Sequence, residues 1–278
     1  MNQGSDDVAT VFQDAAGQAH RPAGEAARVV SLVPSLTELM FTLGLDEALV
    51  GRTTYCIEPA GRVEAVASVG GTKKINMAKL AALRPSHVLV NVDENTEAMA
   101  TEIAQTGVAV VVTHPLVPED NVALFRLIGG LFGRAAEAEA LVQTFEAELE
   151  ATQAAIQDYS FQSALYLIWR NPWMTVSRDT YVSAMLALAG LETLCHDPDR
   201  RYPEVEVTPD LLAVADAVLF SSEPYAFGPA DIEAFRAEHG IAERPRLLAI
   251  DGQMTSWYGS RAIAGLRYLR DFAAKLDG

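Results

Sequence analysis

The three tryptophans of this 278-residue chain stand in two short segments, each with an arginine close by. Trp169 and Trp173 flank Arg170, and Trp257 stands shortly before Arg261. Aromatic faces stack on large, flat, partly apolar ligands, and each contact contributes about 0.5–1.5 kcal/mol beyond its buried area. Arginine pairs with carboxylates or phosphates at the rim of such a ligand. The two segments therefore predict a stacking surface for a large ligand with anionic groups.

A second set of residues has side chains that bind metals. Tyr55 and Cys56 are adjacent, and a phenolate or a thiolate is a good ligand for a metal centre such as haem iron. The alternative for Cys56 is a small apolar side chain that lines a pocket. His114 follows a strand terminus and is the third candidate metal ligand. No HxxE, HExxH or CxxC spacing occurs, so the sequence predicts no preformed zinc site.

The elements that position these residues alternate between strand and helix patterns. An apolar run at Val29–Val33 ends at Pro34, and a second run follows at Ala48–Val50. Between them, apolar residues recur with the spacing of one helix face at Leu36, Leu39, Met40 and Leu43. Such a β-α-β unit has parallel strands, with space for a ligand at their carboxyl ends.

The long segment Arg134–Asp158 contains no Gly or Pro and predicts a helix, which we interpret as a rigid connection because a second β-α-β series follows it. The fold class predicted is α/β, with two Rossmann-like lobes of parallel sheets, one long backbone helix and a ligand cleft between the lobes. The predicted organisation is a flexible N-terminal tail at 1–27, an N-terminal α/β lobe at 28–132, the connecting backbone helix at 133–159 and a C-terminal α/β lobe at 160–278.

The loops that leave the carboxyl ends of the predicted strands give the candidate ligand-binding residues. They are Tyr55, Cys56, Thr72, Lys73, Asn91, Glu94, His114, Trp169, Arg170, Trp173, Glu223, Tyr225, Met254, Trp257, Tyr258 and Arg261.

Arg28–Gly51, which reads RVVSLVPSLTELMFTLGLDEALVG, resembles the entry segment of the helical backbone metal receptors. These class III substrate-binding proteins are the vitamin B12, siderophore and haem receptors, and the resemblance covers nearly the whole chain. It implies that Tyr55, Trp169, Trp173 and Trp257 are pocket residues. Thr72 and Asn91 stand where the vitamin B12 receptors have stacking aromatics, and both departures count against a corrin while leaving a large-ligand cleft.

The resemblance also bears on transport. Transporter-coupled receptors dock on their permease through one glutamate on each lobe. Here Ala78 stands at the first of these positions, and Thr208 or Pro209 stands at the second, with Asp210 as a shifted substitute. Because such docking depends on paired charges for its orientation, their absence predicts a protein that binds its ligand without an ABC permease.

Composition limits the remaining partners and the compartment. A formal charge of −16 argues against nucleic acid and against an anionic membrane surface. The N-terminus has neither a basic region nor the apolar core of a secretory signal, and no apolar run is long enough to cross a membrane, which predicts a cytoplasmic protein. The alternative is a periplasmic protein from which a signal was removed. Two cysteines, Cys56 and Cys195, predict free thiols rather than a disulfide framework.

The sequence therefore predicts a non-enzymatic binding protein for a large metal chelate, which is a corrinoid, a haem or a siderophore-like compound. No cofactor is required, and a corrinoid or haem is expected as the bound ligand. One alternative is an ABC-transporter substrate-binding protein for vitamin B12 or iron chelates. A second is a chelatase-like enzyme, which needs a histidine facing a carboxylate, and His114 with Glu94 or Glu223 is the set available for that role.

Overall fold

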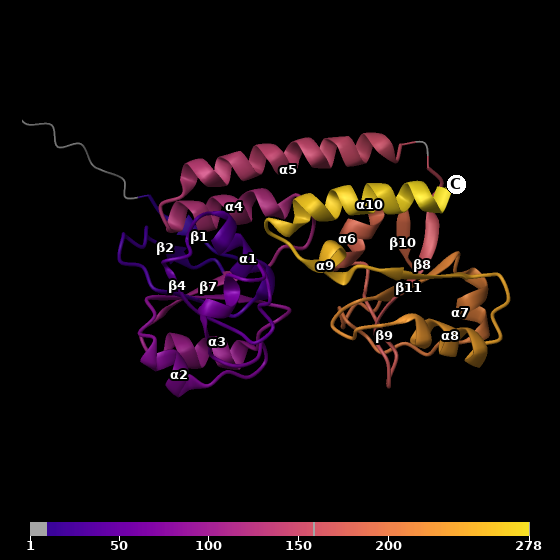
Figure 1. The fold of residues 1–278 in the computed structure, drawn as a ribbon, viewed down its shortest axis with the longest axis horizontal. Helices are drawn as coiled ribbons and strands as arrows, with labels where there is room; N and C mark the ends of the chain where they lie inside the picture. Colours follow the sequence, from indigo (N-terminus) through magenta and orange to yellow (C-terminus); the bar gives the residue numbers. More distant parts are fainter. Residues whose placement is uncertain (1–9, 158, 278) are drawn as a thin grey trace, which may run out of the picture. The chain divides into compact units, whose positions relative to one another are not determined.

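The computed structural model describes residues 10–157 and 159–277, which form two compact units (Figure 1). Unit 1 contains the residues up to His114 together with Asn121–Gln143, and unit 2 contains Pro115–Asp120 together with the residues from Thr144 onward. Helix α5 (Ala135–Ala155) continues from one unit into the next; its 21 residues span about 31 Å. It begins where the sequence predicted and ends before Asp158, which lies outside the described residues. The boundaries predicted from the sequence stay predictions.

The sheet of unit 1 is parallel, and its strands follow the order β5-β4-β3-β6-β7. These strands are β3 (Val29–Ser31), β4 (Leu49–Arg52), β5 (Ala67–Ser68), β6 (His87–Asn91) and β7 (Ala109–Thr113). Neighbouring side chains point to opposite faces of such a sheet, so both faces need apolar cover. The strand predicted first, at Val29–Val33, therefore lies in the centre of the sheet with every residue buried.

Helices cover both faces of this sheet. They are α1 (Pro34–Thr42), α2 (Met77–Ala82), α3 (Glu97–Ala104) and α4 (Asp120–Leu131), with a short 3-10 turn η1 (Val63–Ala65). Figure 1 shows α2 and α3 together along one side of the sheet, where Leu80 and Ile103 pack on Val30, Val88 and Val90. Side chains from one face of the sheet thus form a hydrophobic core with α2 and α3, because a parallel sheet is covered by helices on its faces.

Residues 10–27 do not form the flexible tail that the sequence predicted. They contain a two-stranded antiparallel hairpin of β1 (Phe12–Gln13) and β2 (Ala19–His20). The hairpin binds β7, because Ala15 N donates to Val112 O at 2.9 Å and Val112 N donates to Asp14 Oδ2 at 3.0 Å. The flexible-tail prediction is therefore wrong for residues 10–27, whereas residues 1–9 lie outside the described residues.

Two further contacts fix this hairpin on unit 1. Asp14 Oδ2 also lies 2.9 Å from His20 Nε2, and both side chains are buried. The ring of Phe12 fits against Gly130 of α4, where an added Cβ would lie only 2.2 Å from Phe12 Cε1. The hairpin thus covers the edge of the sheet at β7, a position where unpaired backbone groups would otherwise be exposed.

Unit 2 contains a second sheet, in which β10, β8, β11 and β12 are parallel neighbours in that order. Their bounds are β8 (Gln162–Trp169), β10 (Leu191–Thr193), β11 (Ala217–Ser221) and β12 (Arg246–Ile250). The fifth strand, β9 (Met174–Thr175), pairs antiparallel with the end of β8. Apolar runs in the sequence predict strands at Ala164–Trp169, Ala217–Phe220 and Leu247–Ile250, which agree with β8, β11 and β12 within two residues. The sequence did not indicate the short strands β9 and β10.

The helices of unit 2 are α6 (Tyr181–Ala187), α7 (Pro209–Val214), α8 (Pro229–Glu238), α9 (Gly252–Ser256) and α10 (Arg261–Asp277). Figure 1 shows α7 and α8 together near one end of unit 2, where Leu212 and Phe235 pack on Leu165, Val218 and Phe220 of the sheet. Helix α10 contacts α6 and α9, and it lies beside the end of α5, where Arg267 pairs with Glu148 at 2.7 Å (Figure 1). The predicted α/β class with parallel sheets is confirmed. Within the described ranges, no helix has the length and apolar character needed to cross a membrane.

Candidate functional site

The candidate residues of unit 1 stand on loops at one edge of its sheet, because parallel strands end at the same edge. Thr54 N donates to Gly70 O at 2.7 Å, which joins the loop after β4 to the loop after β5. Tyr55 next to it is 62% exposed, and its ring lies against Gly71, where an added Cβ would be 3.3 Å from Tyr55 Cε2. Tyr55 therefore presents a free aromatic face at this edge.

A network of asparagine side chains holds the loop after β6. Asn95 Oδ1 accepts from Asn91 N at 2.9 Å, and Asn95 Nδ2 donates to Thr72 O at 2.9 Å. Asn91 Nδ2 donates to Thr113 O at 3.1 Å, and Asn91 is only 3% exposed. Among the candidates, Asn91 is thus a loop-positioning residue in this structure. Thr72 is held by its backbone carbonyl, so its half-buried side chain is not part of this network.

Three candidate loops meet at Asp93, which the sequence reasoning had not selected. Lys73 Nζ donates to Asp93 O at 2.7 Å, and His114 Nε2 lies 3.7 Å from Asp93 Oδ1. The imidazole of His114 therefore approaches Asp93 within unit 1, whereas the chelatase alternative named Glu94 or Glu223 as its partner. Glu223 belongs to unit 2. The sequence feature that could have identified Asp93 as a site residue is its position shortly after a buried strand, in the run Asn91–Asn95.

Cys56, the neighbour of Tyr55 in the sequence, is only 1% exposed. Thr37 Oγ1 donates to its sulfur at 3.1 Å, and Thr53 Oγ1 lies 3.2 Å from the same atom. Burial raises the pKa of the Cys56 thiol, and the negative charge of Glu94 raises it further. The thiol form therefore predominates at neutral pH, which favours the packing role over a metal-binding thiolate. No group of three or more His, Cys, Asp or Glu side chains able to hold a metal ion occurs among the residues that the structure describes.

In unit 2, a tight hairpin between β8 and β9 carries three candidates. Asn171 at its tip has φ of 59°, a left-handed conformation that asparagine adopts more easily than most residues. Trp169 at the end of β8 is 40% exposed, and its ring meets that of Tyr225 edge-on with centroids 5.6 Å apart. Trp173 lies further in, stacked on Phe227 and edge-on to Phe235. Trp169 and Tyr225 thus form the more accessible part of this aromatic cluster.

Arg170 of the same hairpin is paired within the protein. Its Nη1 donates to Asp231 Oδ1, and its guanidinium lies over the ring of Trp173 at 5.9 Å. Asp231 also accepts from Gly228 N at 2.9 Å and from Tyr225 OH at 3.3 Å. The bond from Gly228 N is the main cause that holds the pKa of Asp231 below its usual range, and the bonds from Arg170 and Tyr225 lower it further. Asp231 was missed because it lies in the first turn of a helix, where an acidic residue is ordinary capping chemistry.

The last candidate segment is mostly buried. Trp257 is 7% exposed, and its Nε1 donates to Glu223 Oε1 at 2.6 Å. Tyr258 is equally buried, with its ring edge-on to Tyr181 at 5.9 Å. Met254 and Arg261 are half-buried, and the Arg261 guanidinium lies over the Trp257 ring at 5.3 Å. The structure packs both Trp257 and Tyr258 inward, and their contact with a ligand stays a prediction.

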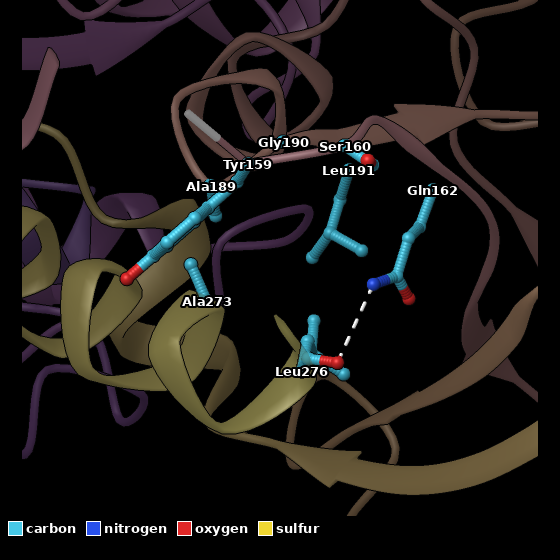
Figure 2. A pocket seen from close by; sticks show the side chains of 8 residues that line it. All are labelled: Tyr159, Ser160, Gln162, Ala189, Gly190, Leu191, Ala273 and Leu276. Atoms are coloured by element: carbon cyan, nitrogen blue, oxygen red, sulfur yellow. Dashed lines mark hydrogen bonds between the residues drawn. The ribbon is translucent and has the colours of Figure 1, made fainter. Parts of the chain in front are cut away.

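Two concavities lie away from these loops. A hollow of about 580 Å³ opens beside the amino ends of the strands in unit 1, where Arg28, Phe41, Leu49, Arg62 and Leu83 line it. Figure 2 shows a second pocket, at the start of β8 and β10, where Gln162 Nε2 donates to Leu276 O at 3.5 Å. Both are at the amino ends of strands, whereas ligands of open α/β sheets bind at the carboxyl ends.

Comparison with known proteins identifies the family of the chain. Residues 29–207 match the family described as periplasmic binding protein. YvrC of Bacillus subtilis (strain 168), an uncharacterized ABC transporter substrate-binding lipoprotein, is 25% identical over 273 residues, which cover 94% of this chain and 84% of that protein. A vitamin B12-binding protein of Pectobacterium carotovorum subsp. carotovorum (strain PC1) is 24% identical over 201 residues, or 71% of this chain and 72% of that protein.

A solved structure shows the same fold. The periplasmic heme-binding protein RhuT from Roseiflexus sp. RS-1, in its apo form, gives a TM-score of 0.78 at 22% identity, covering 91% of this chain and all of that one (100%). The names of the relatives are those of binding proteins, and they favour the periplasmic alternative over the predicted cytoplasmic location. Because the family match covers more than half of the chain and agrees with the resemblance at Arg28–Gly51, the chain belongs to the periplasmic binding protein family.

Proposed function

We propose that this chain is a binding protein for a large metal chelate with anionic groups, which is a corrinoid, a haem or a siderophore-like compound. The observation that carries the proposal is the exposed ring of Trp169, which is supported edge-on by Tyr225 at the carboxyl end of β8. An indole held this way is a preformed apolar face, and burying it against a ligand requires little loss of side-chain entropy. In unit 1, Tyr55 supplies an exposed ring of the same kind.

The names of relatives support the class of ligand. One relative is a vitamin B12-binding protein, and a structural neighbour is a heme-binding protein. Both ligands are metal chelates with extended ring systems, and both carry anionic groups: haem has propionates at its rim, and vitamin B12 has the phosphodiester of its nucleotide loop. We assign the contact with an anionic group of the ligand to Arg261, whose guanidinium lies over the Trp257 ring. Because one relative is a substrate-binding lipoprotein and another is a vitamin B12-binding protein, we place the chain outside the cytoplasm. For the same reason we assign it no catalytic step.

Calorimetric titration with haemin, cyanocobalamin and a ferric siderophore tests this proposal. One of the three is expected to bind saturably, and Trp169→Ala is expected to weaken that binding at least tenfold, or about 1.4 kcal/mol, because the stacking face is lost. Calorimetry is preferred because fluorescence itself changes when a tryptophan is removed.

Phe161→Ala is the matched control. Phe161 is 72% exposed and stands just before β8, whereas Trp169 stands at the other end of the same strand. Its removal is expected to leave the affinity unchanged. Absence of saturable binding for all three compounds, or equal affinity of Trp169→Ala and the wild type, would show that the proposed function is wrong.

A further inference from the structure

Glu223 was a candidate ligand contact, but its carboxylate is turned into the protein. The residue lies in the loop after β11, and its Oε1 atom accepts two hydrogen bonds. One comes from Trp257 Nε1 at 2.6 Å and the other from Ser256 Oγ at 3.0 Å. Both donors belong to the segment that ends α9, so a single oxygen joins two loops of unit 2 that are distant in sequence.

The side chain of Glu223 is closely packed against the start of α9. A Cβ added at Gly252, the first residue of α9, would lie 2.5 Å from Glu223 Cγ, so only glycine leaves room for the side chain. Ser221 Oγ donates to Glu223 O at 2.7 Å and itself accepts from the buried hydroxyl of Tyr166 at 3.0 Å. The hydrogen bond from Ser221 thus holds the backbone of Glu223, and the contact with Gly252 holds its side chain.

The indole that Glu223 holds also supports a cation. The guanidinium carbon of Arg261 lies 5.3 Å from the centre of the Trp257 ring, within the range of a cation–π contact. When its N–H is held by a carboxylate, the indole cannot rotate about its side-chain bonds without breaking that hydrogen bond. The position of the Arg261 guanidinium therefore depends on a ring whose orientation Glu223 fixes.

We propose that Glu223 is a positioning residue for ligand recognition, which acts through Trp257 to set the orientation of Arg261. In its ionised form it holds the indole N–H by a charge-assisted hydrogen bond, and in its protonated form that bond is weakened. The affinity for an anionic group of the ligand then depends on the protonation of Glu223. The role of Arg261 in ligand binding rests on the proposed function, whereas the link between Glu223 and Trp257 does not.

The charges that face Glu223 come from three elements. Burial is the main cause that raises the pKa of Glu223, and Asp251 at the start of α9 raises it further; the hydrogen bonds from Ser256 and Trp257 and the positive charge of Arg261 lower it. The phenol group of Tyr166 on β8 also interacts with Glu223, and that of Tyr268 on α10 accepts a hydrogen bond from Asp251 N at 2.9 Å; burial raises the pKa of both tyrosines. Glu223 therefore titrates above the ordinary range of glutamate.

Indole N–H resonances of the ¹⁵N-tryptophan-labelled full chain test the link without any ligand. The resonance of Trp257, assigned by Trp257→Phe, is expected to shift with a midpoint above the ordinary glutamate range. Glu223→Gln keeps an acceptor oxygen at the same place and is expected to abolish this titration. Arg261→Met is expected to move the midpoint upward, because the positive charge that lowers the pKa of Glu223 is lost.

The Trp169 resonance, from the other aromatic cluster, is the internal control and is expected not to follow the Trp257 midpoint. A Trp257 resonance that does not change with pH, or that titrates unchanged in Glu223→Gln, would overturn the inference. So would an Arg261→Met midpoint equal to that of the wild type.

Haemin binding provides the functional readout. For Glu223→Gln we expect a severalfold loss of affinity at neutral pH and a flatter pH profile than that of the wild type, with Phe161→Ala unchanged. A wild-type pH profile in Glu223→Gln would overturn the positioning role. If the wild type binds no haemin, the proposed function fails for this probe, whereas the indole titration still decides whether Glu223 holds Trp257.

Discussion

At the scale of single residues, the structure separates aromatic side chains that are exposed from those that are held inside. Trp169 and Tyr55 present their rings, whereas Trp257 is enclosed by Glu223 and Arg261. Sequence reasoning placed all three in loops after strands, whereas in the structure only Tyr55 lies in such a loop, Trp169 is the last residue of β8 and Trp257 follows α9. It could not separate them, because the acid that draws Trp257 inward is 34 residues away in the sequence.

The buried carboxyl of Glu223 makes stability depend on pH. Because its folded-state pKa is raised, the native state binds this proton more tightly than the unfolded chain does. The contribution of Glu223 to stability therefore falls as pH rises through the window from the ordinary glutamate value to the raised one. We expect Glu223→Gln to gain stability relative to the wild type across that window, as followed by thermal unfolding at a series of pH values. A constant difference between the two proteins at all pH values would contradict this.

At the scale of elements, the long and strongly periodic segments were predictable and the short ones were not. The run Val29–Val33 and the stripe of Leu36, Leu39 and Leu43 predicted β3 and α1, because buried parallel strands and amphipathic helices leave clear local patterns. Helix α9 has five residues and was interpreted as loop, since one turn leaves no periodicity to detect. The β1–β2 hairpin depends on contacts with β7 and α4, which no local pattern reveals.

The hairpin can be tested at Asp14. This carboxylate accepts from Val112 N and Ala16 N and pairs with His20, and the side chains of Asp14 and His20 are both buried. Asp14→Ala would leave a buried amide and a buried imidazole without their partner, so we expect the free energy of unfolding to fall by about 3 kcal/mol. Urea unfolding measures this change. Gln13→Ala alters an exposed neighbour and serves as control; equal stability of the two variants would show that Asp14 does not secure the hairpin.

At the scale of the whole molecule, the family resemblance raises the question of a membrane partner. Ala78 is exposed in the first turn of α2, and Pro209 is exposed in the first turn of α7. Transporter-coupled receptors have docking glutamates at such positions, and this chain has none at either. We expect the wild type not to bind a vitamin B12 permease complex in lipid nanodiscs, and an Ala78→Glu/Pro209→Glu variant to gain binding through paired charges. Surface plasmon resonance compares them, and tight wild-type binding would contradict the prediction.

The segment at residues 10–27, which contains the β1–β2 hairpin, also has a consequence for how the chain is made. Its partners are Val112 in β7 and Gly130 and Leu131 in α4, all of which are synthesised much later. During translation this segment therefore has none of these contacts while β3, β4 and β6 emerge, and it can form them only after β7 and α4 have been synthesised. The first described segment to leave the ribosome is thus among the last in unit 1 to gain its native contacts, so this edge of the sheet is completed from the opposite end of the unit's sequence.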